Sequence, residues 1–124
     1  MQDHFTDSAA IKGYHAHIYY APETRDTAAR VREGIGTRFK ARLGSWHDEA
    51  VGPHPISMYQ VAFEADEFPR IVPWLMLNCE GLSVLVHPLS GDAYLDHARF
   101  ALWLGTPVAL RLDVLKRLIE KEEA

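Results

Sequence analysis

Residues 14–20, "YHAHIYY", decide how the rest of the chain is interpreted, because their side chains alternate in character along an extended run. Ala16 and Ile18 fall on one side of a strand, and His15 and His17 fall on the other, since successive side chains of a strand point to opposite faces. The stretch therefore predicts a strand with one apolar face and one face that carries two histidines. These histidines are either part of a metal site or polar residues on a half-exposed face, and the rest of the chain has to distinguish the two.

Periodicity beyond this stretch predicts alternating helices and strands. Apolar residues three or four apart predict helices, and strict alternation predicts strands. The predicted elements are a strand at 13–20, a helix at 22–43 stopped by Gly44, a weak strand at 45–51, a turn at 51–55, a strand at 56–64, a helix at 66–79 and a strand at 82–88. Asp66 is the expected cap of the second helix, and Pro73 is the position where that helix would break.

The order strand, helix, strand, strand, helix, strand is the βαββαβ arrangement of ferredoxin-like domains, which predicts an α+β fold with an antiparallel sheet. We expect the spatial strand order 4-1-3-2, with the first and third strands parallel in the middle. Two additional C-terminal helices are predicted, one from an Asp92 cap to Gly105 and one that starts with Thr106 as cap and Pro107 at the first position. Residues 13–124 are expected to form a single domain, and residues 1–12 a flexible N-terminal extension.

Composition narrows the classes of function. The chain has 13 Lys and Arg against 17 Asp and Glu, a net charge of -4, which argues against binding to nucleic acid or to an anionic membrane surface. It contains neither a run of about 18 apolar residues nor a signal-peptide pattern, so we expect a cytoplasmic protein. Cys79 is the only cysteine, so an intrachain disulfide and a Cys-rich zinc site are excluded.

A metal would therefore depend on His, Asp and Glu. The predicted topology brings four of the seven histidines to one end of the sheet: His15 and His17 at the start of the first strand, His54 before the third, and His87 at the end of the fourth. His47 is expected at the opposite end. A His-x-His pair on one face places its rings roughly 6.5 to 7 Å apart at Cβ, a span that a metal can bridge.

The histidine-bearing face also needs a cover. The third predicted strand has apolar residues on both faces, with Val61 and Phe63 on one and Met58 and Ala62 on the other. Burial of such area is favourable by roughly 25 cal/mol per Å². We expect the C-terminal helices, the partner of a homodimer, or both to cover the second face.

Four motifs, "YHAHIYY", "GPHP", "LSVLVHPLSGD" and "DHARFALWLG", together resemble the DOPA 4,5-dioxygenase family. The resemblance spans roughly residues 13 to 105 and follows the order of the motifs in that family. It implies extradiol ring opening of L-DOPA or a related catechol by O₂ at a non-haem Fe(II), with zinc as the alternative metal. The implied partners are thus a small aromatic substrate and O₂.

Within this interpretation we assign His17 and His87 as metal ligands. His15 and His54 compete for the third ligand position and for acid–base catalysis, for which an imidazole with a pKa near 6.5 is suited. His97, on the helix predicted after the fourth strand, is a third candidate for catalysis.

Two residues are candidates for substrate binding. Tyr19 shares the face of the two histidines on the first strand, and Arg99 could reach a substrate carboxylate or phenolate over the pocket. Alternatively, Arg99 pairs with Asp96 across one helical turn.

Two questions stay open at this level. Many oxygen-activating iron sites use two histidines and one carboxylate, for which Glu49 is the nearest candidate, and a three-histidine site is the alternative. The competing function is a non-catalytic, dimeric ferredoxin-like domain that binds a small molecule or a structural metal.

Overall fold

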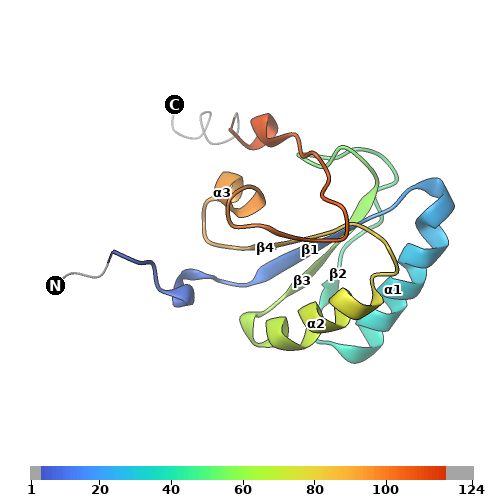
Figure 1. Ribbon diagram of the computed structural model, residues 1–124, viewed down its shortest axis with the longest axis horizontal. Helices are drawn as coiled ribbons and strands as arrows, with labels where there is room; N and C mark the ends of the chain where they lie inside the picture. The colour runs from blue at the N-terminus through green and yellow to red at the C-terminus, as the bar shows by residue number, and fades with distance from the viewer. Residues whose placement is uncertain (1–3, 117–124) are drawn as a thin grey trace.

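The computed structural model describes residues 4–116 and has the predicted α+β architecture (Figure 1). The strands are β1 (Tyr14–Tyr19), β2 (Arg42–Leu43), β3 (Met58–Phe63), β4 (Val84–Pro88) and β5 (Leu102–Leu104). The α-helices are α1 (Arg25–Arg38), α2 (Phe68–Asn78) and α3 (Ala93–His97), and residues 112–116 are also helical. Short 3-10 helices occupy Ser8–Ala10, Pro22–Thr24 and Ala65–Glu67.

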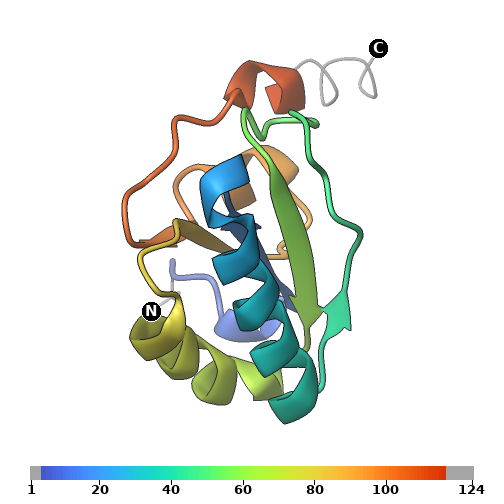
Figure 2. The ribbon, with the colours of Figure 1, turned by 90° about the vertical axis from the view of Figure 1, so that its right-hand side faces the viewer.

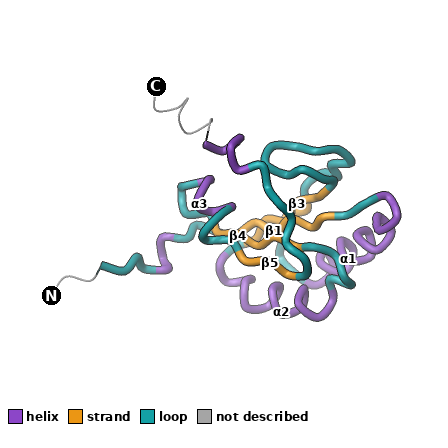
Figure 3. Tube along the Cα trace, turned by 45° about the horizontal axis from the view of Figure 1, so that its top comes forward, coloured by secondary structure: helices purple, strands orange, loops and turns teal. Residues whose placement is uncertain are grey.

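The strands form one antiparallel sheet in the order β2-β3-β1-β4-β5. This is the ferredoxin-like order 4-1-3-2 with β5 added beside β4, so the predicted fold class is confirmed. Figure 1 shows α1 and α2 on one side of the sheet, and α3 with the C-terminal segment on the other. In the view of Figure 2, α1 runs lengthwise beside β3, and Figure 3 shows α3 separated from α1 and α2 by the sheet.

Alternation along the strands explains the two apolar clusters. Ala16 and Ile18 on β1 point toward α1 and α2, where they join the main core with Ile35 and Leu75. The opposite face has a smaller cluster formed by Tyr19, Met58 and Leu85. Ala101, Trp103, Val108 and Leu110 pack against this second cluster. The C-terminal part of the chain thus covers the second face, as expected, although it does so mainly as a strand and an extended segment.

The expectation that the first and third strands run parallel is wrong, because β1 and β3 pair in antiparallel fashion. The crossover through α1 leaves β2 parallel to β1, and the connection to β3 then reverses the chain direction. Tyr19 at the end of β1 is consequently opposite Met58 at the start of β3. The turn before β3 therefore lies near the end of β1 rather than near its beginning.

Helix α1 ends at Arg38, earlier than predicted. Phe39 adopts an extended conformation and packs edge-on against the ring of Trp74, with a centroid separation of 5.7 Å. Leu43 pairs with Val61 in the sheet, and Lys40 donates its backbone N–H to the Glu67 carboxylate. These tertiary contacts outweigh the continued helical spacing of the apolar residues.

Residues 45–51 do not form the predicted second strand. That strand is β2, and the following segment contributes only isolated bridges, including one between His47 and Met58. The predicted turn at 51–55 is confirmed by the bridge between Val51 and His54. Asp66 lies inside a 3-10 helix instead of capping α2, and Pro73 lies within α2 without ending it.

The segment from Asp92 to Gly105 is helical only at its start. Asp92 accepts a hydrogen bond from the Leu95 N–H and caps α3, as predicted, but α3 ends at His97. Residues 102–104 form β5 because the free edge of β4 offers hydrogen bonds to a short apolar run that fits either structure. Thr106 and Pro107 do not start a helix, and the part of this predicted helix beyond residue 116 lies outside the described residues.

Within the predicted extension, residues 4–12 contain the 3-10 helix Ser8–Ala10, and the Lys12 N–H donates to the Leu89 carbonyl at 2.8 Å. Lys12 thereby joins this segment to the chain that leaves β4. Among residues 4–116, no helix combines the length and the apolar character needed to cross a membrane.

Replacement of Gly105 by Ala is expected to destabilise the protein on the order of 3 kcal/mol. Gly105 has a φ of +71°, and an added Cβ would lie 2.7 Å from the Leu82 carbonyl oxygen. Gly81→Ala is the matched control, because Gly81 has a φ of +83° but no atom within 4 Å of the added Cβ. It should cost only about 1 to 2 kcal/mol. Equal free energies of unfolding for the two variants, measured by chemical denaturation, would contradict this account.

Candidate metal centre

Residues that are directly opposite one another on adjacent strands share a face of the sheet. His15 on β1 is opposite His87 on β4, and His17 is opposite Leu85. The face covered by α3 and the C-terminal segment therefore contains all three histidines of β1 and β4. Alternation in "YHAHIYY" and "LSVLVHP" suffices to explain this part of the site.

Two histidines from outside the strands, His54 before β3 and His97 at the end of α3, complete a cluster of five. The Nε2 atoms of His17 and His87 are 3.0 Å apart. The ring centroids of His17 and His54 are 4.2 Å apart, and those of His87 and His97 are 4.0 Å apart. Within residues 4–116, two groups bring three ligand nitrogens to within 4.8 Å of one another: His15, His17 and His87, and His17, His54 and His97. His17 is common to both groups.

His54 reaches the cluster by a route that the sequence did not predict. The turn before β3 lies at the far end of β1, but it folds back over the sheet and is held there by a hydrogen bond from the Arg111 N–H to the Pro53 carbonyl, at 2.8 Å. His47 bridges to Met58 and contributes to the electrostatic environment of His54. The expectation that His47 lies at the opposite end from His54 is therefore wrong.

Hydrogen bonds donated by Nδ1 orient the rings. His87 Nδ1 donates to the Pro88 carbonyl at 2.9 Å, and His97 Nδ1 donates to the Ala93 carbonyl at 2.7 Å. His17 Nδ1 lies 3.4 Å from Sδ of Met58, which can only accept. A neutral imidazole with its proton on Nδ1 presents a lone pair at Nε2, and metal-binding histidines generally show this arrangement.

Burial keeps the imidazoles of His17, His54 and His87 uncharged. Desolvation, followed by the neighbouring His97, lowers the pKa of His54 to about 4 and that of His87 to about 3. The pKa of His17 is held well below its ordinary value by desolvation and by the surrounding histidines. The pKa of half-buried His15 is lowered by desolvation, by His97 and by Arg42, and Asp96 partly opposes this effect. The ligand nitrogens are therefore available at neutral pH without loss of a proton.

The geometry fits a metal ion. Two ligands bound at about 2.1 Å and at right angles lie about 3.0 Å apart, which matches the separation between His17 Nε2 and His87 Nε2. Two lone pairs directed at each other at this distance repel, and a cation between them removes the repulsion. His15, whose ring is 5.2 Å from that of His87, adds a third nitrogen on the same face.

Tyr19 and His54 form a buried pair next to this group. The Tyr19 hydroxyl is 2.6 Å from His54 Nδ1, and its ring stacks on Trp103 at 5.7 Å. Burial raises the pKa of Tyr19, so the phenol keeps its proton. Tyr19 is 2% exposed and in this structure orients His54; its assignment to substrate binding stays a prediction.

The remaining predicted residues lie around the cluster. Asp96 is buried and accepts hydrogen bonds from the backbone and side chain of Ser90, so the expected Asp96–Arg99 pair does not form. Arg99 is exposed and lies over the Phe100 ring. Glu49 is exposed and belongs to neither ligand group, so among the described residues the potential metal groups contain only histidines.

Sequence reasoning missed Met58 and Trp103, which contact His17 and Tyr19 respectively. The signal for Met58 was present, because an antiparallel pairing of the first and third strands places it opposite Tyr19. Trp103 could not be found in this way because its segment was predicted to be helical.

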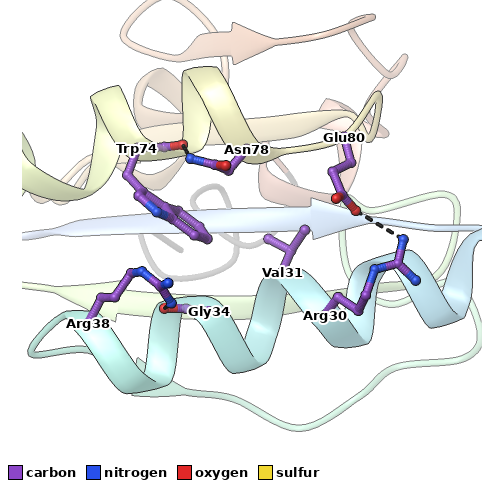
Figure 4. Close-up of a pocket in the computed structure, with 7 residues that line it drawn as sticks. All are labelled: Arg30, Val31, Gly34, Arg38, Trp74, Asn78 and Glu80. Carbon is purple, nitrogen blue, oxygen red and sulfur yellow. Dashed lines mark hydrogen bonds and ion pairs between the residues drawn. The ribbon is translucent and has the colours of Figure 1, made fainter.

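A cavity of about 190 Å³ lies between α1 and α2, on the other side of the sheet (Figure 4). Its polar groups are already engaged: Arg30 pairs with Glu80, and Asn78 donates to the Trp74 carbonyl. No histidine lines this cavity, so it offers no imidazole ligand for a metal. We therefore place the candidate metal site at the histidine cluster.

Comparison with known proteins agrees with the geometry. The model of the Dopa 4,5-dioxygenase family matches residues 14–114, a span that contains all five clustered histidines. The chain belongs to the DOPA 4,5-dioxygenase family. Membership in this family supports a dioxygenase. That class is an oxidoreductase that uses a small substrate and O₂.

The chain spans different shares of the curated relatives that it matches. It is 32% identical to an "Uncharacterized 21.2 kDa protein" of Botryotinia fuckeliana over 95% of this chain and 71% of that protein. It is 31% identical to the "DOPA 4,5-dioxygenase" of Amanita muscaria over 82% of this chain, and it spans about half (49%) of that protein.

A solved structure resembles the whole domain. The crystal structure of a "putative dioxygenase" from Nostoc punctiforme is 54% identical, with a TM-score of 0.91 over 92% of this chain and 99% of that one. The fold of that protein therefore extends across nearly the full length of this chain.

Proposed function

We propose that this protein is an extradiol dioxygenase that opens the ring of L-DOPA or a related catechol with O₂ at a non-haem Fe(II). The observation that carries the proposal is the pair of Nε2 atoms of His17 and His87, 3.0 Å apart, with each Nδ1 held by the protein. Family membership and the name of the Amanita relative supply the reaction class.

His17, His87 and His15 are the proposed ligands. They come from two adjacent strands, and their positions are fixed by the register of the sheet. Three protein ligands leave coordination positions free, and a bound iron would supply Lewis-acid and redox chemistry to a catechol and O₂ there. Rigid strands are suited to hold such a ligand set, because a strand tolerates little displacement of its side chains.

His54 is the proposed acid–base residue. Tyr19 and Nδ1 of His54 share one hydrogen bond, which leaves Nε2 for a substrate hydroxyl. When Nδ1 carries the proton and donates to the Tyr19 oxygen, Nε2 is a base that can take a proton from a substrate hydroxyl. The imidazolium formed in this way, with Nδ1 still hydrogen-bonded to Tyr19, can later return that proton from Nε2. His97, beside both His54 and His87, is the second candidate for this task.

The test is oxygen consumption after anaerobic reconstitution with Fe(II), with L-DOPA and a short panel of catechols as substrates. We expect oxygen uptake stoichiometric with a coloured ring-opened product. Reconstitution with Zn(II) is the matched control and should bind without oxygen uptake, because zinc has no redox chemistry. A folded protein with bound iron and no uptake with any catechol would contradict the proposal.

A further inference from the structure

The sheet face that contains the histidines continues beyond them onto β3 and β2. Arg42 on β2 is opposite Ala62 on β3, and Ala62 is opposite His15 on β1. Because directly opposed residues share a face, Arg42, Ala62, His15 and His87 form one row across four strands. A guanidinium therefore lies on the histidine face, two strands from His15.

Two observations make this end of the row suitable for a ligand. Arg42 and Gln60 are not buried: Arg42 is exposed, and Gln60, opposite His17, is half-buried. Ala62, which lies between Arg42 and His15 in the row, is small and buried. The cover formed by residues 101–110 packs against Tyr19, Met58 and Leu85, which come from the other rows of this face.

The Arg42 guanidinium is only loosely engaged in the structure. Its ion pair with Glu64 is loose, at 3.9 Å, with side chains 74% and 67% exposed. A pair of this kind is readily exchanged for another carboxylate.

The Gln60 side chain makes no hydrogen bond within residues 4–116, although it is next to His17 across the strands. Its amide offers both a donor and an acceptor on the face between the histidines and Arg42. The arrangement thus has the Arg42 cation at one end and the ligand histidines at the other. Small Ala62 and the unused amide of Gln60 lie between them.

From this geometry we infer that Arg42, assisted by Gln60, binds the carboxylate of the substrate side chain and selects catechols that have one. Adjacent strands are about 4.8 Å apart, so Arg42 and His15 are separated by roughly 10 Å at the backbone. A catechol ring with a two- or three-carbon carboxylate side chain spans this interval once the Arg42 side chain bends toward the site. A guanidinium binds a carboxylate through two parallel hydrogen bonds, which favours Arg over other cations.

The inference rests on the proposed function only in taking a catechol as the ligand. Arg99, the cation that the sequence suggested for this role, lies over Phe100 and serves as the comparison. Replacement of Arg42 and replacement of Arg99 should therefore affect the preference for a carboxylate ligand differently. This difference in binding can be measured without turnover.

The experiment is anaerobic calorimetry of the Fe(II)-loaded protein with two ligands, 3-(3,4-dihydroxyphenyl)propionate and 4-propylcatechol, which lacks the carboxylate. We expect the wild type to bind the carboxylate ligand at least about 10-fold more tightly. Arg42→Gln should bind the two ligands equally and leave the affinity for 4-propylcatechol unchanged. Arg99→Gln should keep the full preference.

A preference that survives in Arg42→Gln, or one that is lost in Arg99→Gln, would overturn the inference, as would failure of the wild type to bind either ligand. Oxygen uptake, measured separately, decides the proposed function. Loss of preference in Arg42→Gln without any uptake would keep the carboxylate site and reject the dioxygenase. Oxygen uptake by the wild type together with an unchanged preference in Arg42→Gln would support the dioxygenase and reject the carboxylate site.

Discussion

Replacement of His17 by Ala is expected to remove bound iron and oxygen uptake together. His17 belongs to both groups of ligand nitrogens, and its Nε2 is 3.0 Å from that of His87, so neither group keeps three histidines without it. Changes to residues that only orient metal ligands already cost 10- to 100-fold in affinity or activity, so loss of His17 itself should cost more than about 100-fold. Iron content and oxygen consumption of the purified variant are the measurements.

His47→Ala is the matched control. His47 is half-buried and lies near His54, but it belongs to neither ligand group, so this variant should keep its iron and its activity. Because His17 is buried, His17→Gln should be measured as well, since it preserves more of the packing than Ala does. Circular dichroism establishes that each variant is folded. Turnover with full iron content in either His17 variant would remove His17 from the site.

The metal-free protein is expected to lose stability as the pH falls below about 6.5. Desolvation lowers the pKa of His54 to about 4 and that of His87 to about 3, whereas both titrate near 6.5 in the unfolded chain. Between these values the unfolded state therefore binds more protons than the folded state, so the free energy of unfolding decreases as the pH is lowered through that window. Above about pH 6.5 the contribution of the neutral histidines to stability should be fully present.

Between pH 6.5 and 5, each of these two histidines should remove about 2 kcal/mol, a large part of the stability of a small domain. Chemical denaturation at pH 7.5 and pH 5 measures this loss. His54→Gln should show a smaller loss because Gln does not titrate, whereas replacement of exposed His4 by Gln should not change it. The same free energy of unfolding at both pH values in the wild type would contradict the burial of neutral histidines.

Much of the ligand set follows from local sequence patterns. The alternation in "YHAHIYY" places His15 and His17 on one face, and the alternation before Pro88 places His87 on the same face once β4 pairs with β1. The strand order 4-1-3-2 also follows from the succession of elements. These predictions hold because the side-chain period of a strand is a property of the backbone itself.

The tertiary structure decided the positions of the two histidines outside the strands. His54 joins the cluster because the turn at 51–54 folds over the sheet and is tied to Arg111, a contact between residues far apart in the chain. His97 is positioned by the end of α3, where the chain leaves the helix to form β5. The spacing of apolar residues in that segment fits a helix and a strand equally well, so only the free edge of β4 selected the strand.

The sequence by itself thus determined the fold class and the histidines of β1 and β4, because hydrophobic alternation acts locally along each strand. It could not determine the end of α1 or the convergence of His54 and His97. Phe39 leaves the helix to pack on Trp74, and Leu43 pairs with β3, both through partners distant in sequence. Such contacts contribute to the free energy only after the chain has folded, and they outweigh local preferences that differ by less than about 1 kcal/mol per residue.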